Sequence, residues 1–360
     1  MIRIASVNQD SGISPERAKG AAVHLQAMRH AFRQLGCEIK AVDTPDPEAL
    51  KQALEEPDGP TFDMLYERYA LGRDEAARFA AANGIPYVLE INAPLADEAA
   101  RYRDRQETAV ERARDHFLFK QADCILAVSS QVAEYAYSRG ASPDRVMVCP
   151  NGIDTERFHA QVDGNTIRDL YVPPDHLVLG FHGRERPWHG FELLVSAFKQ
   201  LLERRWPVHL MVVGNGGFEA LSELPEGSYS RVGWQDHEDI PSFVAAFDLL
   251  PLTYGTDVPF YFSPLKLMEA MACGVVPIVP NLGDLDMIVE HEKTGLVYRA
   301  GDARALVHSL ERLVSEADLL RGLGQGAANY AKAHAWIDIA RAVLRRVMPS
   351  MQDQYLEAGK

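Results

Sequence analysis

Short apolar and β-branched runs alternate with amphipathic segments along most of this 360-residue chain. This alternation predicts parallel β-sheets whose strands are joined by helical crossovers. A polar, turn-rich stretch over 151–174, which includes Pro173 and Pro174, interrupts the pattern before it begins again. A chain of this length can bury two hydrophobic cores. We therefore predict an α/β protein with two consecutive sheets.

The periodicity assigns an approximate range to each element. Strands are expected at 1–7, 38–43, 62–68, 86–92, 123–129, 145–150, 177–182, 207–213, 229–233, 249–252, 275–279 and 295–298. Helices are expected at 18–35, 73–83, 96–119, 130–139, 190–204, 217–223, 239–247, 264–273, 284–290 and 303–315. A last helical pattern over 333–354 either completes the second domain or crosses back to the first.

The overall charge excludes some classes of partner. A net charge of −14 argues against nucleic acid or an anionic membrane as a bulk electrostatic partner. No apolar run approaches the roughly 18 residues of a membrane span, and residues 1–7 are typical of a strand rather than a signal peptide. The four cysteines show no metal-ligand spacing. We expect a cytoplasmic protein without a transmembrane segment and without a bound metal.

One short segment carries the strongest chemical signal. Ser263 is a candidate N-cap, Pro264 suits the first helical position, and Gly274 can end the helix in the left-handed conformation. Lys266 and Glu269 are the only charges in this apolar helix and share one face. An anion at the helix N-terminus would attract the lysine, and attached hydroxyls would bind the glutamate. The alternative is an ion pair that only stabilises its own helix.

Loops that follow strands supply further candidates. Arg184 and Arg186 follow the strand 177–182, and arginine binds phosphate in a bidentate manner. Gly214 follows another apolar strand and permits close backbone approach. Asn92 lies at the end of the strand 86–92 and can form a hydrogen bond with a hydroxyl group. The alternatives are an ordinary charged loop, a plain turn and an Asx turn.

Together these motifs resemble those of retaining glycosyltransferases of family 4. The matching segments are Gly20–His24, Ala122–Ser129, Pro150–Phe158, Gly183–Gly190, Gly214–Gly216, Val232–Trp234, Ala246–Pro251, Ser263–Gly274 and Asp284–Gly295. The resemblance implies the GT-B architecture, in which two Rossmann-like domains face each other across a cleft. On this basis we expect an acceptor domain over 1–160, a donor domain over 161–332 and a C-terminal helical segment over 333–360.

The resemblance also implies roles for individual residues. The donor is expected to be a nucleotide diphosphate sugar, with no further cofactor, and the acceptor a glycan, a lipid-linked molecule or a small metabolite. Cations that act on the diphosphate are expected at Lys266, Arg186 and Arg184. Other donor contacts are expected at Glu269 for the ribose, at the backbone near Ser263 and Leu265 for the diphosphate, and at Gly214, Val232 and Trp234 for the base. Gly20 is expected to allow close approach of the diphosphate or the acceptor. Acceptor contacts are expected at Asn92 and His24.

Two positions depart from the family pattern and keep other functions open. Tyr261 stands where the family often has a first glutamate, and His189 stands where the phosphate loop usually has lysine. A protein that binds sugar nucleotides without catalysis is therefore one alternative. Another GT-B enzyme, such as a nucleotide-sugar epimerase, is a second. The leading expectation remains metal-independent glycosyl transfer with retention of anomeric configuration.

Overall fold

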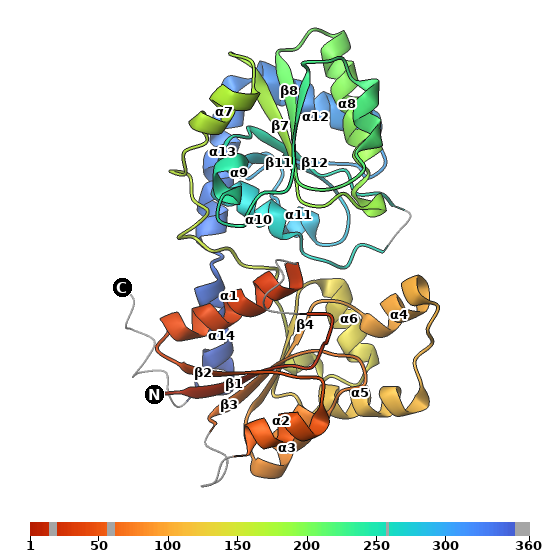
Figure 1. Ribbon diagram of the computed structural model, residues 1–360, viewed down its shortest axis with the longest axis vertical. Helices are drawn as coiled ribbons and strands as arrows, with labels where there is room; N and C mark the ends of the chain where they lie inside the picture. The colour runs from red at the N-terminus through yellow and green to blue at the C-terminus, as the bar shows by residue number, and fades with distance from the viewer. Residues whose placement is uncertain (14–19, 56–61, 257–258, 350–360) are drawn as a thin grey trace. The chain divides into compact units, whose positions relative to one another are not determined.

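The chain forms two compact units in a computed structural model (Figure 1). The structure describes residues 1–13, 20–55, 62–256 and 259–349. Unit 1 consists of Met1–Asn151, Tyr261–Ser263 and the C-terminal segment from Trp336, and unit 2 of Gly152–Phe260 and Pro264–Ala335. The first boundary between the units thus lies after Asn151, at the start of the turn-rich stretch. The sequence analysis expected the domain boundary later, between residues 160 and 161.

Unit 1 is built on a six-stranded parallel sheet in the order β2-β1-β3-β4-β5-β6. Its strands are β1 (Arg3–Asn8), β2 (Glu38–Asp43), β3 (Met64–Arg68), β4 (Tyr87–Ile91), β5 (Cys124–Ala127) and β6 (Val146–Val148). Its helices are α1 (Gly20–Gln34), α2 (Pro47–Leu54), α3 (Glu75–Asn83), α4 (Leu95–Arg103), α5 (Ala109–Gln121), α6 (Ser130–Ser138), the 3-10 turn η1 (Pro143–Arg145) and α14 (Trp336–Val347). Helix α14 packs against α1 and β5.

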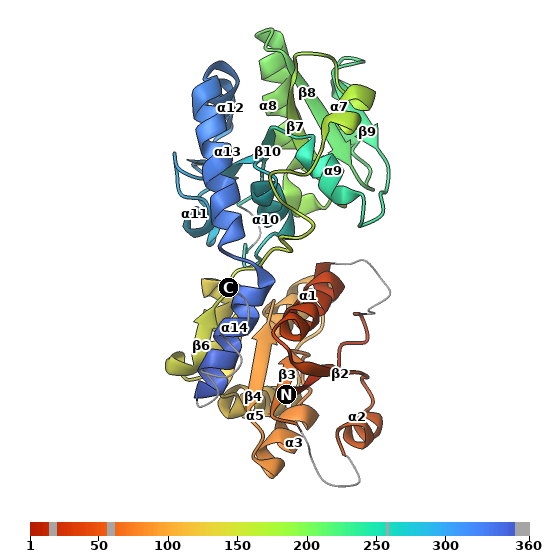
Figure 2. The ribbon, with the colours of Figure 1, turned by 90° about the vertical axis from the view of Figure 1, so that its left-hand side faces the viewer.

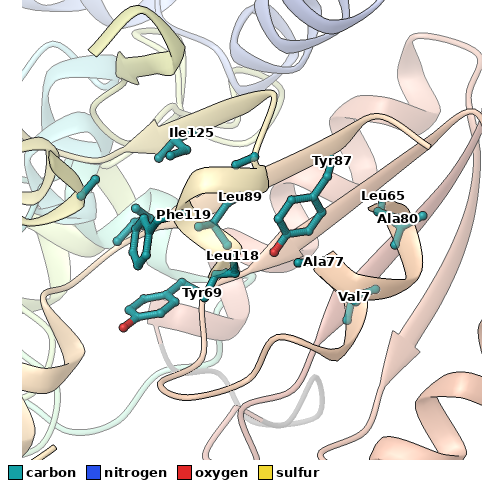
Figure 3. Packing of buried hydrophobic residues seen from close by; sticks show 14 of the residues in the cluster. Val7, Leu65, Tyr69, Ala77, Ala80, Tyr87, Leu89, Leu118, Phe119 and Ile125 are labelled. Atoms are coloured by element: carbon teal, nitrogen blue, oxygen red, sulfur yellow. The ribbon is translucent and has the colours of Figure 1, made fainter. Parts of the chain in front are cut away.

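Apolar side chains of the central strands form the core of unit 1. Strands β3 and β4 are buried along their whole length, as expected for a parallel sheet covered by helices. Figure 3 shows part of this core, in which strand residues Val7, Leu65, Leu89 and Ile125 and the aromatic residues Tyr69 and Tyr87 share one cluster with the helix residues Ala77, Ala80, Leu118 and Phe119. The apolar runs of the sequence therefore become the buried layers of the domain.

Unit 2 repeats the same architecture with the strand order β12-β11-β10-β7-β8-β9. Its strands are β7 (Leu177–His182), β8 (Val208–Val213), β9 (Tyr229–Val232), β10 (Leu249–Pro251), β11 (Val276–Pro280) and β12 (Leu296–Tyr298). Its helices are α7 (Asn165–Tyr171), α8 (Phe191–Glu203), α9 (Ile240–Ala245), α10 (Leu265–Ala272), α11 (Leu285–Ile288), α12 (Ala303–Ser315) and α13 (Ala317–Lys332), with 3-10 turns η2 (Pro187–His189) and η3 (Glu219–Glu223). In Figure 2, α12 and α13 lie side by side.

The strand order of each sheet marks where a ligand can bind. In unit 1 the chain moves outward from β1 to β2 and then returns to place β3 on the other side of β1. In unit 2 the chain likewise moves outward from β7 to β8 and β9 and then returns to place β10 on the other side of β7. Ligands of open parallel sheets bind beyond the carboxyl ends of the strands at such switch points. Each unit therefore has one preferred site.

The expected helix 96–119 is wrong, because the structure contains two helices there, α4 and α5. Asp104 ends α4 in the left-handed conformation, with φ of 47°. Thr108 then begins α5, and its side chain forms a capping box with Glu111. The Thr-x-x-Glu signal was therefore present in the sequence and marked the break.

Three helices, α2, α7 and α13, lie where the sequence analysis expected none. Helix α13 contains three glycines, which lower intrinsic helix propensity. Two of them permit close packing, because a Cβ at Gly324 would lie 2.5 Å from the Gly274 carbonyl oxygen and one at Gly326 would lie 2.0 Å from that of Lys293. Tertiary packing thus supplies the stability that local propensity lacks. No helix among the described residues combines the length and apolar character needed to cross a membrane.

Candidate functional site

The loops after β7 and β10 contact each other at the switch point of unit 2. Gly190 has φ of +60°, and a Cβ there would lie 1.9 Å from the carbonyl oxygen of Thr253. The Thr253 hydroxyl donates a hydrogen bond of 2.9 Å to the carbonyl oxygen of His189. A side chain at position 190 would therefore separate the two loops. The glycine is required by this close approach.

The loop after β8 is held against the loop after β7. The Glu185 carboxylate accepts a hydrogen bond of 2.5 Å from the Phe218 N–H, and the Glu185 N–H donates to the Asn215 carbonyl oxygen at 3.1 Å. Gly214 has φ of +129°, and a Cβ there would lie 2.4 Å from the carbonyl oxygen of Gly183. The loops that follow β7, β8 and β10 are therefore held together by direct contacts.

Lys266 lies in the first turn of α10, beside strand β7 and the loop that follows it. Its Nζ lies 4.5 Å from the centroid of the Phe181 ring, and a Cβ at Gly183 would lie 3.7 Å from the same nitrogen. No carboxylate of the described residues lies within ion-pair distance of this ammonium. Burial lowers the pKa of Lys266 to about 8, against the opposing effect of Glu269. The site therefore contains a cation that forms no ion pair within the part of the chain that the structure describes.

Glu269 lies one turn further along α10, and its side chain is only 13% exposed. Burial raises the pKa of its carboxyl group to about 7, although Lys266 and Arg157 act in the opposite direction. Its Oε2 atom lies 3.6 Å from Nε2 of His182. Burial and the charge of Lys266 lower the pKa of His182 to about 3, so this imidazole is neutral at pH 7. The carboxyl group therefore remains available to accept hydrogen bonds from the hydroxyl groups of a ligand.

The expected arginines lie in the same loop but are exposed. The guanidinium carbon of Arg186 lies 5.7 Å from the centroid of the Trp188 ring, and Arg184 is also exposed. Burial, Lys266 and Arg186 lower the pKa of His189 to about 3, in that order of importance. His189 is consequently neutral and does not replace the lysine that the family pattern places there. Positive charge in this loop comes from the arginines.

The residues expected near the base lie at the ends of neighbouring strands. The Gly214 N–H donates a hydrogen bond of 2.9 Å to the Val232 carbonyl oxygen. Val232 is buried, whereas Trp234 is 58% exposed and presents a large aromatic surface. Leu265 begins α10, in the same unit. Unit 2 therefore contains Lys266, Glu269, Arg184, Arg186 and all of these residues.

The expected role of Ser263 as a helix cap is wrong. The helix begins at Leu265 after Pro264 and has no side-chain cap. The Ser263 hydroxyl accepts a hydrogen bond of 3.0 Å from the Asn151 N–H, and the Asn151 side-chain amide donates to the Ser263 carbonyl oxygen at 2.6 Å. These contacts place the segment Tyr261–Ser263 in unit 1. Ser263 thus anchors the chain before α10.

Three further expected residues also belong to unit 1. Gly20 begins α1. The Asn92 amide donates a hydrogen bond of 3.1 Å to Nδ1 of His24, and Nε2 of His24 lies 3.2 Å from a Glu90 carboxylate oxygen. This carboxylate also accepts a hydrogen bond of 2.7 Å from Arg68. Asn92 and His24 are therefore brought together, as one buried polar network.

Sequence reasoning missed Glu90 and Arg68 in this network. Both residues are buried, Glu90 at 1% and Arg68 at 8% exposure. Burial alone would raise the pKa of Glu90, but His24, Arg68 and Tyr66 outweigh it and lower the pKa to about 2. Charged residues inside apolar strands were the available signal, since such charges are rarely buried without partners. Among the described residues, no cluster of His, Cys, Asp and Glu could hold a metal ion.

Comparison with protein families gives two matches. Residues 176–316 match the model of the glycosyl transferases group 1, and residues 69–157 match that of glycosyltransferase family 4. The D-inositol 3-phosphate glycosyltransferase of Corynebacterium efficiens is 28% identical over 297 residues, which cover 77% of this chain and 69% of the relative. The enzyme of the same name from Stackebrandtia nassauensis is 26% identical, with 79% and 67% covered.

Solved structures with the same fold cover nearly the whole chain. Sucrose-phosphate synthase from Thermosynechococcus elongatus aligns with a TM-score of 0.74 at 17% identity, and covers 97% of this chain and 100% of the other. Anabaena HepE in complex with UDP aligns with a TM-score of 0.73 at 18% identity and the same coverage. These similarities confirm the expected GT-B fold class with two Rossmann-like domains.

Proposed function

Since the chain belongs to the group 1 glycosyltransferases of family 4, we propose that it transfers a sugar from a nucleotide diphosphate to an acceptor hydroxyl group with retention of configuration. In this proposal unit 2 binds the donor and unit 1 binds the acceptor. The observation that carries it is the pair on α10: among the described residues, no carboxylate lies within ion-pair distance of the Lys266 ammonium, and no hydrogen-bond donor contacts the Glu269 carboxyl group.

The chemistry follows from where charge develops. As the bond between the sugar C1 and the phosphate oxygen breaks, negative charge grows on the leaving diphosphate. In this proposal Lys266, assisted by Arg184 and Arg186, stabilises that charge, and the N-terminus of α10, which has no side-chain cap, adds the positive end of the helix dipole. The Glu269 carboxylate accepts hydrogen bonds from the ribose hydroxyl groups. We propose that these cations make a bound metal unnecessary.

One nucleotide can be chosen as the donor for a first experiment. Anabaena HepE is described in complexes with UDP and with UDP-glucose. We propose a uridine diphosphate sugar as donor, with the base beside Trp234 and Val232. Uridine, guanosine, adenosine and deoxythymidine diphosphates should be compared by thermal unfolding. A ligand at 100 times its Kd stabilises the folded protein by about 2.7 kcal/mol, so the preferred base gives the largest shift.

Mass spectrometry distinguishes transfer from the alternative functions. Incubation with UDP-glucose and a panel of hydroxyl acceptors, with EDTA present, is expected to yield UDP and a glycosylated product. Binding without turnover would instead support a catalytically inactive protein, an alternative favoured by Tyr261, whose hydroxyl group donates to Glu98 in unit 1. Conversion of the donor without an acceptor into an epimer would support a nucleotide-sugar epimerase.

Nucleotide binding should depend on pH through Lys266. Its pKa lies near 8 in the free protein, and a bound diphosphate raises that pKa by its negative charge. Binding therefore takes up a proton above pH 8, and the Kd is expected to rise with pH, approaching tenfold per unit. The Glu269 carboxyl group, with a pKa of about 7, is largely ionised above pH 8 and therefore contributes little to this dependence there.

Titration calorimetry with UDP between pH 8 and pH 9.5 measures this dependence. Lys266→Arg is the matched variant, because a guanidinium remains charged throughout the range. The rise in Kd should disappear in this variant. An equal rise in both proteins would show that another group titrates.

A further inference from the structure

His182 is the last residue of β7 and lies at the carboxyl end of the sheet in unit 2. The residue is only 5% exposed, and its Nε2 atom has no hydrogen-bond partner among the described residues. Buried polar atoms are normally satisfied, so an unpartnered ring nitrogen beside a candidate binding site needs a donor from a ligand. The imidazole takes no part in the chemistry proposed above.

The hydrogen bonds of the ring determine which of its nitrogens carries the proton. The imidazole is neutral at pH 7, because burial and the charge of Lys266 lower its pKa to about 3. A neutral imidazole has one N–H donor and one bare nitrogen acceptor. The ring also forms a hydrogen bond with the Lys266 backbone, which raises the pKa of His182 as a bond to a carbonyl oxygen does. Since Nε2 is without a partner, Nδ1 is the donor and Nε2 is the acceptor.

The Nε2 atom of His182 lies beside a second acceptor. It is 3.6 Å from Oε2 of Glu269, which is too far for a hydrogen bond between the two side chains. No donor among the described residues contacts the Glu269 carboxyl group either. The two side chains therefore form a pair of adjacent acceptors. A ligand must offer two neighbouring donors to satisfy both of them.

We infer that His182 is a second ribose-binding residue, whose Nε2 atom accepts a hydrogen bond from one hydroxyl group of the ribose and so shares the diol with Glu269. The inference rests on the proposed function and adds to it a requirement for both adjacent hydroxyl groups. A deoxyribose would leave one of the two acceptors unsatisfied. A site built to bind a hydroxyl group strongly rejects an analogue that lacks it. The site is therefore selective for ribonucleotide donors.

Titration calorimetry with UDP, 2′-deoxy-UDP and 3′-deoxy-UDP tests this inference on the full chain. The parent should bind each deoxynucleotide about tenfold more weakly than UDP, the effect of leaving one buried acceptor unsatisfied. His182→Phe keeps a ring but removes the acceptor, and should bind UDP about tenfold more weakly than the parent does. Its preference for UDP over one deoxynucleotide should disappear, whereas its preference over the other should remain. Glu269→Gln should weaken the preference that His182→Phe retains.

Two further variants separate the contact from general effects. His182→Gln is the conservative change, because the amide oxygen of glutamine can accept a hydrogen bond near the position of Nε2, and it should partly restore UDP binding. His209→Phe is the matched control. His209 is also buried and has one unpartnered ring nitrogen, but it lies near the start of β8, where it pairs with Val178 at the opposite end of the sheet. This variant should bind all three nucleotides as the parent does, and thermal unfolding verifies that each variant is folded.

Nitrogen NMR spectroscopy observes the same contact in the unaltered protein. With isotope-labelled histidine rings, the Nε2 signal of His182 is the unprotonated-nitrogen signal that His182→Gln lacks. This signal should shift when UDP binds, and should shift much less with the deoxynucleotide that lacks the contacting hydroxyl group. A role of His182 in packing alone would not distinguish the two deoxynucleotides.

The results separate this inference from the proposed function. If UDP binds but His182→Phe keeps both preferences of the parent, or if the Nε2 signal does not move, the inference is wrong and the proposed function stands. Equal binding of UDP and both deoxynucleotides by the parent would overturn the roles of His182 and Glu269 together. If no nucleoside diphosphate binds at all, the proposed function itself fails.

Discussion

Replacing Lys266 by methionine is expected to lower kcat by about 10²- to 10³-fold, the effect of removing one preorganised charge donor. The ammonium lies beside the loop after β7 and has no competing carboxylate within ion-pair distance among the described residues. Its charge is therefore available to the leaving diphosphate. Methionine keeps a similar length and apolar stem, so the change removes mainly the charge.

Lys266→Met should leave the stability of the folded protein unchanged or raise it. A loss of kcat in this variant could then not be attributed to unfolding. Burial lowers the pKa of Lys266, so the charged form destabilises the folded state at pH 7 and this cost disappears only as pH rises above about 8. Lys266→Met should therefore unfold at the same temperature as the parent or higher. Lys199→Met, an exposed lysine on α8, is the control for general effects. A kcat within threefold of the parent would remove Lys266 from the mechanism.

Replacing Glu269 by glutamine is expected to weaken nucleotide binding by about 1.5–3 kcal/mol, the value of hydrogen bonds to a charged group. The carboxyl group has no protein hydrogen-bond donor among the described residues, and glutamine preserves its shape. The loss should thus come from the ligand contacts. Titration calorimetry with UDP measures it directly.

A second nucleotide shows whether the lost contacts are those of the ribose. The affinity of the parent should fall when UDP is replaced by 2′-deoxy-UDP, whereas Glu269→Gln should show a smaller difference between the two ligands. Glu192→Gln, an exposed glutamate in the first turn of α8, is the matched control. Equal losses for both nucleotides in the Glu269 variant would contradict the ribose role.

The sequence predicted the sheets better than the helices that connect them. A buried parallel strand is a continuous apolar run, and the range 177–182 for β7 agrees with the structure. The glycine-rich helix α13 escaped prediction because its stability comes from close packing against the residues around Gly274 and Lys293. The division between α4 and α5 was encoded locally by Thr108 and Glu111, and was overlooked.

Only those residues of the candidate site that lie close together in the sequence could be predicted. Lys266 and Glu269 stand out because they are charges in an apolar helix. The contact of Gly190 with Thr253 could not be predicted, because it joins residues that meet only when β10 returns beside β7. A pocket in unit 1, lined among others by Gln9, Asp10, Tyr69 and Arg73, depends on the same kind of convergence, between the loops after β1 and β3.

A crystal structure of the protein with bound UDP would test the central claim most directly. The account predicts that the ribose hydroxyl groups lie within hydrogen-bond distance of the Glu269 carboxylate and that a diphosphate oxygen lies within ion-pair distance of Lys266 Nζ. A nucleotide bound elsewhere, or one bound here with its ribose away from Glu269, would contradict it.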